Sequence, residues 1–323
     1  MTLAQFLKTV IDLSVEHFWL IAVFLGLWWL WAFGLGLLGG WLLAKGSLAR
    51  FPKIKSKDKI LILAPHIDDE IIGCGGIIQQ AKNNNAQVLV VYATNGDGNR
   101  LPMLGDNKGF NPNDFITLGE TRMEEAKKAT TLLGLEKENL IFLGYPDSGL
   151  KAMLNKYFYP DKPFTSPGTR FNYNPYRGTW REGQLYTGSN LIKDLGKIIS
   201  DFQPTIIFCP HPRDNHGDHR GLSLFLEKTL QDENRNIKLY GYLIHFKFYP
   251  PKKKLKIHEF LYPPRRLFSR EGWYSFDLSA DQLTKKFEAV CQNFSQLKGP
   301  HISDLLKSFV KRNEIFEELE LDE

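Results

Sequence analysis

Histidine and acidic residues that could bind a metal ion follow a predicted buried strand early in the sequence. The group is Pro65-His66-Ile67-Asp68-Asp69-Glu70, which comes directly after the apolar run Ile60–Ala64 and leads into a glycine-containing apolar segment. Such a run predicts a buried strand, and acids before an apolar segment predict the first turn of a helix. In an open α/β sheet this turn lies at the carboxyl edge, where such folds place their chemistry. Taken alone, the group also fits a helix cap, since acids at a helix N-terminus are stabilised by roughly 0.3–1 kcal/mol.

The second half of the chain repeats the arrangement. Residues 204–209 predict another buried strand, and an amphipathic helix begins near Arg220. Between them lie three of the eight histidines and two aspartates: His211, Asp214, His216, Asp218 and His219. Imidazole with carboxylate is the ligand set of a catalytic zinc or a similar ion. The alternative is a hydrogen-bonded polar loop, and it stays open above all for His211 and Asp214.

These residues carry a family resemblance. The chain resembles the PIG-L/LmbE-like de-N-acetylases, zinc-dependent enzymes that remove acetyl from N-acetylglucosamine units on small molecules or lipids. Their motif Ala-His-Pro-Asp-Asp-Glu is matched by residues 65–70, with Ile67 in place of the family proline. Their His-x-Asp-His motif is matched by His216–His219, and two further matches are the helix start Gly119–Arg122 and the loop Leu143–Leu150. The resemblance covers roughly Lys57 to His245, and its four motifs keep their order.

The resemblance implies a metal site with a general base beside it. It assigns His66, Asp69 and His219 as metal ligands, for zinc or another divalent ion such as iron, and it assigns Asp68 as the general base. A catalytic zinc takes three protein ligands and keeps an open position for water. The spacing alone does not choose between Asp68 and Asp69 as the ligand.

The resemblance also implies roles around the substrate. His216 would stabilise the oxyanion or protonate the leaving amine, and Asp218 would orient His216. Arg122 and Asp147 match positions that contact the sugar in the family.

The predicted elements alternate between strand and helix. We expect strands at residues 59–64, 87–94, 139–143, 205–209 and about 237–245, with helices ending near residues 83 and 231 and spanning 121–133 and 190–200. Alternation of this kind predicts an α/β, Rossmann-like fold with a largely parallel sheet covered by helices on both faces. The glycines of Gly73–Gly76 lie inside a predicted helix, so no dinucleotide-binding fingerprint is supported. Two more helices are expected, at 280–297 and 302–321.

An apolar stretch precedes this domain. Residues 18–44 contain no charged residue and hold five of the seven tryptophans, and this length can cross a bilayer core of about 30 Å. A cleaved signal peptide would be shorter and would follow a basic start, whereas Asp12 and Glu16 precede this run. The alternative is a buried hairpin of the domain. We therefore expect an N-terminal segment at 1–17, a transmembrane helix at 18–44, a basic linker at 45–57 and a deacetylase domain at 58–323.

The charges that flank the stretch predict its orientation. Six basic residues follow it and only Lys8 precedes it; the six are Lys45, Arg50, Lys53, Lys55, Lys57 and Lys59. Basic residues within about 15–20 positions of a span stay on the cytoplasmic side. Three cysteines without a framework also argue against an oxidising compartment. We therefore expect a single-pass membrane protein whose catalytic domain faces the cytoplasm.

Three other segments invite a functional interpretation. The connections 95–119 and 148–189 are too long for simple loops, and the second is rich in aromatic residues. We expect both to form lids over a sugar or lipid pocket rather than to pack plainly on the sheet. The basic, proline-containing region 250–266 suits either contact with anionic lipid or a solvated face.

The expected function is that of a zinc-dependent N-deacetylase acting on an N-acetylglucosamine-type sugar, carried on a lipid or on a small molecule. Membrane lipid is an expected partner, and nucleic acid is not. One alternative is an amidase acting on another acylated amino-sugar metabolite. A second is a non-catalytic membrane protein with a structural metal site, but such sites normally take four ligands with cysteine prominent, and neither motif offers a cysteine in place.

Overall fold

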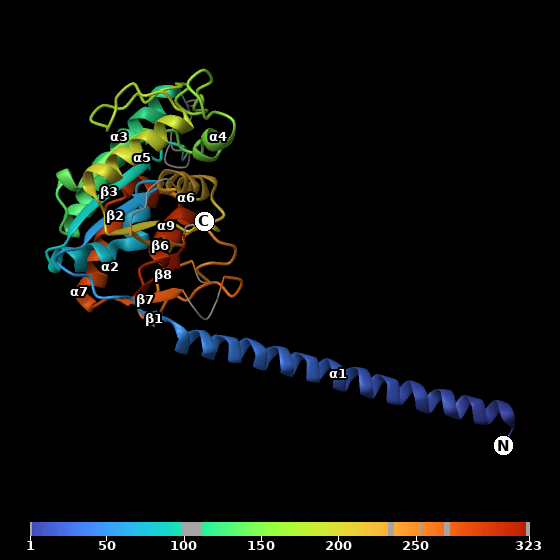
Figure 1. The fold of residues 1–323 in the computed structure, drawn as a ribbon. Coiled ribbons are helices and arrows are strands. Elements are labelled where there is room, and N and C mark those ends of the chain that lie inside the picture. The colour runs from blue at the N-terminus through green and yellow to red at the C-terminus, as the bar shows by residue number, and fades with distance from the viewer. Residues whose placement is uncertain (1, 99–110, 232–235, 252, 268–271, 321–323) are drawn as a thin grey trace. The chain divides into compact units, whose positions relative to one another are not determined.

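The computed structural model describes all of the chain except residues 1, 99–110, 232–235, 252, 268–271 and 321–323 (Figure 1). The chain divides into two compact units, Met1–Leu48 and Ala49–Glu323. The first unit is helix α1 (Leu3–Ser47), whose cap Thr2 accepts a hydrogen bond from the backbone N–H of Gln5. The window His17–Leu35 in α1 has a mean hydropathy of 2.0 and is long and apolar enough to cross a bilayer. Signal sequences meet the same criterion of length and composition.

The second unit is built on one mixed sheet. Its strands are β1 (Ala49–Arg50), β2 (Lys59–Ala64), β3 (Gln87–Thr94), β4 (Leu140–Tyr145), β5 (Ile206–Pro210), β6 (Lys238–Tyr242), β7 (Trp273–Asp277) and β8 (Asn313–Leu319). They lie in the order β1-β7-β8-β6-β5-β2-β3-β4. The run from β6 to β4 pairs in parallel throughout, whereas β8 is antiparallel to both β6 and β7.

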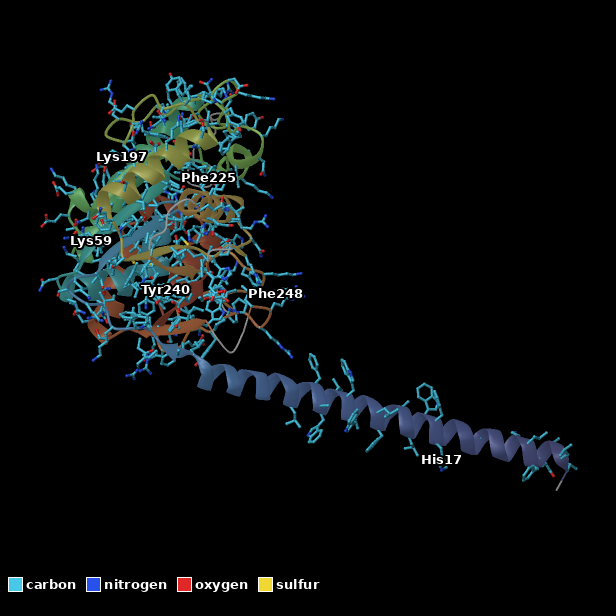
Figure 2. The ribbon with its side chains drawn as sticks, viewed as in Figure 1. His17, Lys59, Lys197, Phe225, Tyr240 and Phe248 are labelled. Atoms are coloured by element: carbon cyan, nitrogen blue, oxygen red, sulfur yellow. The ribbon has the colours of Figure 1, made fainter. Side chains whose placement is uncertain are left out.

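Helices cover both faces of this sheet. They are α2 (Asp69–Asn83), α3 (Pro112–Leu132), α4 (Leu150–Asn155), α5 (Gly188–Phe202), α6 (Gly217–Leu230), α7 (Ala280–Cys291), α8 (Phe294–Leu297) and α9 (Pro300–Ser308), with a short 3-10 helix η2 at Lys137–Asn139. Helices α4, α5 and α6 contact one another, and α7 contacts both α2 and α3. In β2, Leu61 and Leu63 pack into a core with Phe225 of α6, while Ile60 and Ile62 are fully buried on the other face. Figure 2 labels Phe225 and Tyr240 within this packed interior.

The arrangement of β2 and β5 creates the expected active edge. These strands are parallel neighbours in the middle of the sheet. Helix α2, which follows β2, packs with α7, whereas α6, which follows β5, packs with α4 and α5. Connections that leave adjacent strands toward opposite faces open a crevice at the carboxyl ends of the strands. The two motif groups of the sequence therefore lie side by side.

The C-terminal region differs from the sequence-based expectation. A helix was expected at 302–321, but α9 ends at Ser308 and residues 313–319 form β8. Ile315 and Phe316 of β8 are buried, and Glu314 accepts hydrogen bonds from the N–H groups of two α2 residues and pairs with the buried Lys286 at 2.6 Å. These tertiary contacts override the helical preference of a glutamate- and leucine-rich segment.

The segment expected as a basic linker, 45–57, is partly built into the domain. Only Leu48 separates the last residue of α1 from β1, and Ala49 pairs with Tyr274 of β7. Phe51 is buried, and its ring centroid lies 4.8 Å from that of Tyr240. Lys53, Lys55 and Lys57 remain exposed. The compact unit that contains the sheet therefore begins at Ala49.

Candidate active site and metal centre

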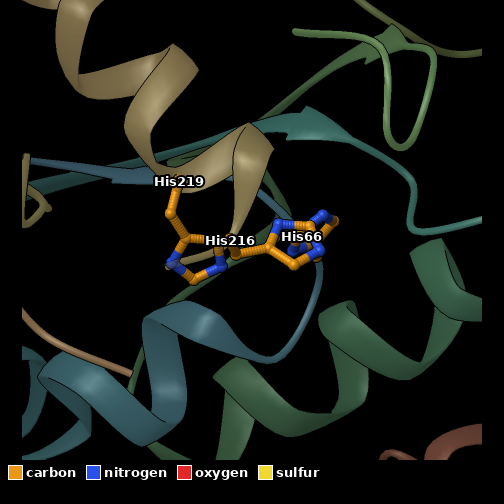
Figure 3. Close-up of side chains that lie close together, drawn as sticks. All are labelled: His66, His216 and His219. Atoms are coloured by element: carbon orange, nitrogen blue, oxygen red, sulfur yellow. The ribbon is translucent and has the colours of Figure 1, made fainter. Parts of the chain in front are cut away.

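The two motif groups meet at the carboxyl ends of β2 and β5. His66 lies in the turn between β2 and α2, while His216 caps α6 and His219 lies in its first turn. Figure 3 shows the three imidazoles together, with ring centroids 4.8 Å apart for His66 and His216 and 5.4 Å apart for His66 and His219. The structure thus brings together residues about 150 positions apart that were proposed as one site.

Asp69 lies between two of the histidines. Its Oδ2 atom is 3.2 Å from Nδ1 of His66 and 3.2 Å from Nε2 of His219. An ion held tetrahedrally by bonds of about 2.0–2.1 Å keeps its ligand atoms roughly 3.4 Å apart. The Asp69 oxygen therefore lies at a ligand-like distance from one nitrogen of each histidine, although the candidate metal groups among the described residues combine His66, Asp69 and His219 with other donors.

Other donors surround these ligands. Among the described residues, three overlapping groups place one possible ligand atom from each member within 4.8 Å of the others: His66, His216 and His219; Asp69, His219 and His245; and His66, Asp147 and Asp218. The site offers more donors than a catalytic zinc uses, which is three plus an open position. These overlapping groups share residues, so they define one candidate metal region with several possible ligand sets.

Among the site residues, His219 has the surroundings that best fit a cation. Its side chain is fully buried, and neither ring nitrogen has a hydrogen-bond partner among the described residues, although a carboxylate oxygen lies 3.2 Å from each. A buried polar atom left unsatisfied costs about 1–3 kcal/mol. An ion at Nε2, with Asp214 facing Nδ1, would satisfy both nitrogens, which is how carboxylates usually orient metal-binding histidines. The residues present therefore fit a metal.

The charges of the site also favour a cation. Burial lowers the pKa of His219, but the carboxylates of Asp69 and Asp214 outweigh that effect and raise it to about 10. Burial raises the pKa of Asp69, yet His219 and His66 reverse this and hold it well below its usual range. Both shifts mean that positive charge next to these carboxylates is stabilised.

Asp68 has an unusual backbone and a tuned carboxyl group. Its φ of 115° lies where residues other than glycine are rare, and such strain concentrates at functional sites. Its backbone N–H donates to Oε2 of Glu70 at 3.0 Å. Burial raises the pKa of the Asp68 carboxyl to about 7 despite the opposing charge of Arg122. A pKa near neutrality suits a general base.

Arg122 holds this turn in place. Its guanidinium donates to Oδ2 of Asp68 at 3.1 Å, to the carbonyl of Gly96 at 2.6 Å and to the carbonyl of Ile67. Gly96 has a φ of 64°, and a Cβ there would come within 1.9 Å of the guanidinium. The Arg122 side chain is buried, although it reaches the cavity wall. Arg122, which the resemblance assigns to sugar binding, therefore directly supports Asp68.

Asp218 supports His66 rather than His216. Its carboxylate accepts hydrogen bonds from the N–H groups of Ser148 and Leu150, at 2.6 and 3.0 Å, and its Oδ2 lies 3.2 Å from Nε2 of His66. Toward His216 the contact is through the backbone, since the Asp218 N–H donates to Nδ1 of His216 at 3.3 Å. The resemblance implied that Asp218 orients His216, but its carboxylate contacts His66 instead.

Asp147 lies at the same edge of the sheet, after β4. Its Oδ1 is 3.7 Å from Nε2 of His66, and its Oδ2 accepts from the N–H of Gly98 at 3.1 Å. It lines the cavity together with His66, Asp68 and Asp69.

His245 belongs to the site and was missed in the sequence. It follows β6, its ring centroid lies 4.7 Å from that of His219 and 5.1 Å from that of His216, and it lines the cavity. Burial and the charge of His219 lower its pKa to about 3, so the imidazole is neutral. Its signal was a histidine at the end of the last predicted strand, the same pattern that singled out His66.

For Asp214 and His211 the structural interpretation is favoured. Asp214 accepts hydrogen bonds from the backbone N–H groups of His216, Ile244 and His245, in addition to facing His219. His211 accepts from the N–H of Arg213 at 3.0 Å and stacks on a tryptophan ring of β7. Both residues shape the loop rather than line the cavity.

The cavity has a volume of about 240 Å³ and two kinds of wall. The catalytic candidates form the polar wall, and aliphatic residues from α2, the β6 end and α9 form the other: Ile72, Ile244, Ile302, Leu305 and Leu306. The α9 residues lie beyond the region of the family resemblance. The C-terminal helices therefore complete the pocket.

The long aromatic connection 148–189 does not behave as the expected lid. Tyr157, Phe158, Phe164 and Trp180 pack against the hydrophobic core. Apart from Ser148, none of its residues lines the cavity as described. The aromatic content of this connection is explained by the burial of its rings against the core. In the other connection, residues 99–110 lie outside the described part of the chain.

Known proteins resemble this chain in sequence and in fold. A family profile described as GlcNAc-PI de-N-acetylase (PIG-L) matches residues 61–229, just over half of the chain. The N,N'-diacetylchitobiose deacetylase from Pyrococcus horikoshii, complexed with an inhibitor, is 19% identical at a TM-score of 0.51, covering 81% of this chain and 84% of that chain. A deacetylase from the biosynthesis pathway of teicoplanin is 16% identical at a TM-score of 0.50, covering 80% and 97%.

The fold likeness extends to a different chemistry. The 4-carboxy-2-hydroxymuconate hydratase from Pseudomonas putida is 13% identical at a TM-score of 0.51, covering 82% of this chain and 98% of that chain. At such identities the likeness concerns the fold alone, and a fold does not set a reaction. The family profile carries more weight, because the matched region contains both motif groups and the edge at which they meet. The chain belongs to the PIG-L family of de-N-acetylases.

Proposed function

We propose that this protein is a metal-dependent deacetylase that removes the N-acetyl group from an N-acetylglucosamine-type sugar carried on a membrane lipid. The observation that carries the proposal is the buried cluster in which Asp69 stands 3.2 Å from a nitrogen of His66 and of His219, beside a carboxyl of near-neutral pKa on Asp68. Family membership supports the same reaction.

His66, Asp69 and His219 would hold the ion, zinc or another divalent metal such as iron, and a bound ion would polarise the amide carbonyl and acidify a water molecule. Asp68 takes the proton of the attacking water, since Arg122 fixes its carboxylate at the cavity wall. The water oxygen adds to the amide carbon, the C–N bond then breaks, and acetate and the free amino sugar leave.

His216 acts either on the carbonyl oxygen or on the nitrogen of the amide. Its Nδ1 accepts the N–H of Asp218, which places the proton of a neutral ring on Nε2. From there it donates a hydrogen bond to the developing oxyanion or gives its proton to the leaving amine. Asp147, held by the N–H of Gly98, accepts hydrogen bonds from sugar hydroxyls.

The membrane part of the proposal rests on α1 and its flanks. Its window His17–Leu35 meets the length and hydropathy of a single span, and exposed basic residues follow it at Arg50, Lys53 and Lys55. We place the domain on the cytoplasmic side for this reason. An enzyme tethered to the bilayer by such a span meets a lipid-borne substrate at a high local concentration.

A second candidate is amide hydrolysis on an amino sugar with a longer acyl group. The aliphatic wall formed by Ile302, Leu305 and Leu306 favours it, because an acetyl group alone has little apolar surface to bury there.

The experiment measures release of the carboxylic acid by full-length protein from N-acetyl and N-octanoyl glucosamine lipids in vesicles. We expect acetate release that Asp68→Asn abolishes. A shortened protein beginning at Leu48, which retains the packed Phe51, should cleave a soluble analogue but act slowly on vesicles. Faster release of octanoate would select the second candidate, and no release from any amide would refute both.

A further inference from the structure

An aromatic residue stands out in solvent directly after the active site. Ile244 and His245 line the cavity, and the chain then makes a tight turn in which Phe246 bridges to Tyr249. Phe248 at the tip of the turn is 83% exposed, with a φ of 62° that few residues other than glycine adopt (Figure 2). An exposed phenylalanine in a strained backbone conformation is hard to explain by folding alone.

One basic residue contacts this ring, and others follow it in the sequence. Lys247 lies over it, with Nζ 5.2 Å from the ring centroid. The described part of the stretch from Lys247 to Arg266 adds five exposed cations: Lys253, Lys254, Lys256, Arg265 and Arg266. Its one acid, Glu259, pairs with Lys311 at 3.0 Å. The segment is therefore strongly positive on its solvent side.

Exposed aliphatic side chains lie between these cations. Leu255 and Ile257 are each more than a third exposed and alternate with Lys254 and Lys256. Basic residues interleaved with exposed aromatic and aliphatic ones are the composition of a surface that enters the headgroup region of a bilayer. A loop that only faced solvent would gain nothing from an exposed phenylalanine at position 248.

We propose that the described residues 246–251 and 253–266 form a docking surface for an anionic lipid bilayer. Phe248 inserts between headgroups, and the lysines and arginines attract the negative lipids. Since consecutive Cα atoms are 3.8 Å apart, Phe248 lies at most about 11 Å along the chain from His245. Docking at this surface therefore holds the mouth of the cavity at the membrane. The surface does not depend on the reaction proposed above, so each can fail without the other.

Charge complementarity selects the partner. Each basic residue near an anionic bilayer strengthens binding by about fivefold, and three together by about a hundredfold. An acidic protein would match the charge but would not require the exposed Phe248 and Ile257 beside it. Salt should weaken the contact because the charges are exposed.

The test follows amide hydrogen exchange in full-length protein reconstituted in two kinds of vesicle, phosphatidylcholine alone and phosphatidylcholine mixed with phosphatidylglycerol. We expect residues 246–251 and 253–266 to exchange more slowly only with phosphatidylglycerol, and to lose this protection at high salt. Because the readout is local, it separates this segment from α1 and its basic flank.

Matched variants complete the test. Replacing Lys253, Lys254 and Lys256 with glutamine should remove most of the protection, as should Phe248→Gly, which suits the positive φ. The control replaces three exposed lysines on the helical faces with glutamine, Lys128, Lys193 and Lys228; it has the same net charge and should keep the protection. Equal exchange in both vesicles, or equal loss in the control, would overturn the proposal. Unchanged exchange in β2 and β5 shows that each variant is folded.

Discussion

Replacing Arg122 with lysine tests whether Arg122 positions the general base or binds the sugar. The guanidinium reaches Asp68 at 3.1 Å and the Gly96 carbonyl at 2.6 Å, and it also donates to Ile67. Lysine keeps the charge but lacks the planar fork, so it cannot hold all of these acceptors. A hydrogen bond to a charged group contributes about 1.5–3 kcal/mol. If the bond to Asp68 is lost, we expect kcat to fall by about 10- to 150-fold.

Steady-state kinetics on a soluble N-acetylglucosamine amide give the answer. Because Arg122 is only 3% exposed, KM should change little and the metal content should stay that of wild type. Asp147→Asn is the comparison, since that carboxylate lines the cavity and its loss should raise KM. An Arg122→Lys protein with a raised KM and an unchanged kcat would refute the positioning role, since that pattern marks the loss of ground-state binding.

Three further predictions follow from the packing. Burial and the charge of Asp147 raise the pKa of Asp97 from 3.8 to about 6; because the folded pKa is the higher one, stability falls as pH rises from about 4 to 6. Thermal unfolding should therefore show Asp97→Asn more stable than wild type at pH 7, by up to about 3 kcal/mol, and no gain below pH 4. Lys286→Ala leaves a buried carboxylate unpaired and should cost about 3–5 kcal/mol in denaturant unfolding, whereas the exposed neighbour Lys285→Ala should cost about 1 kcal/mol or less. Asp218→Asn removes a carboxylate that orients a metal ligand, so competition with a chelator should show about 10- to 100-fold weaker metal binding; unchanged affinity would mean that Asp218 only holds the loop.

The sequence predicted the elements that carry the site because their signals are local. The run Ile60–Ala64 falls within β2, and β3 spans the expected residues 87–94. Once both motifs followed parallel strands, topology required His66 and His219 to meet. Helix α3 begins at Pro112, nine residues before the expected start, because Asn111 caps it through a reciprocal bond with Asp114.

What the sequence did not predict depends on long-range packing. No local pattern shows that Asp218 turns toward His66, because that direction is set by the N–H groups of the β4–α4 loop. The strand β8 has a helical composition and becomes a strand only when Ile315 and Glu314 are buried against the rest of the domain. Helix α9, whose residues line the cavity, contacts α7 and α8.

Metal analysis of purified variants tests the central claim most directly. About one divalent ion per chain is expected in wild type and in Asp68→Asn, whose rate should nevertheless fall by about 10²–10⁴. Asp69→Ala and His219→Ala should lose most of the ion, because each removes an atom from the buried cluster. The control His258→Ala removes an exposed histidine outside the site and should retain it. Equal metal content in wild type, Asp69→Ala and His219→Ala would contradict the assignment of this cluster as the metal centre.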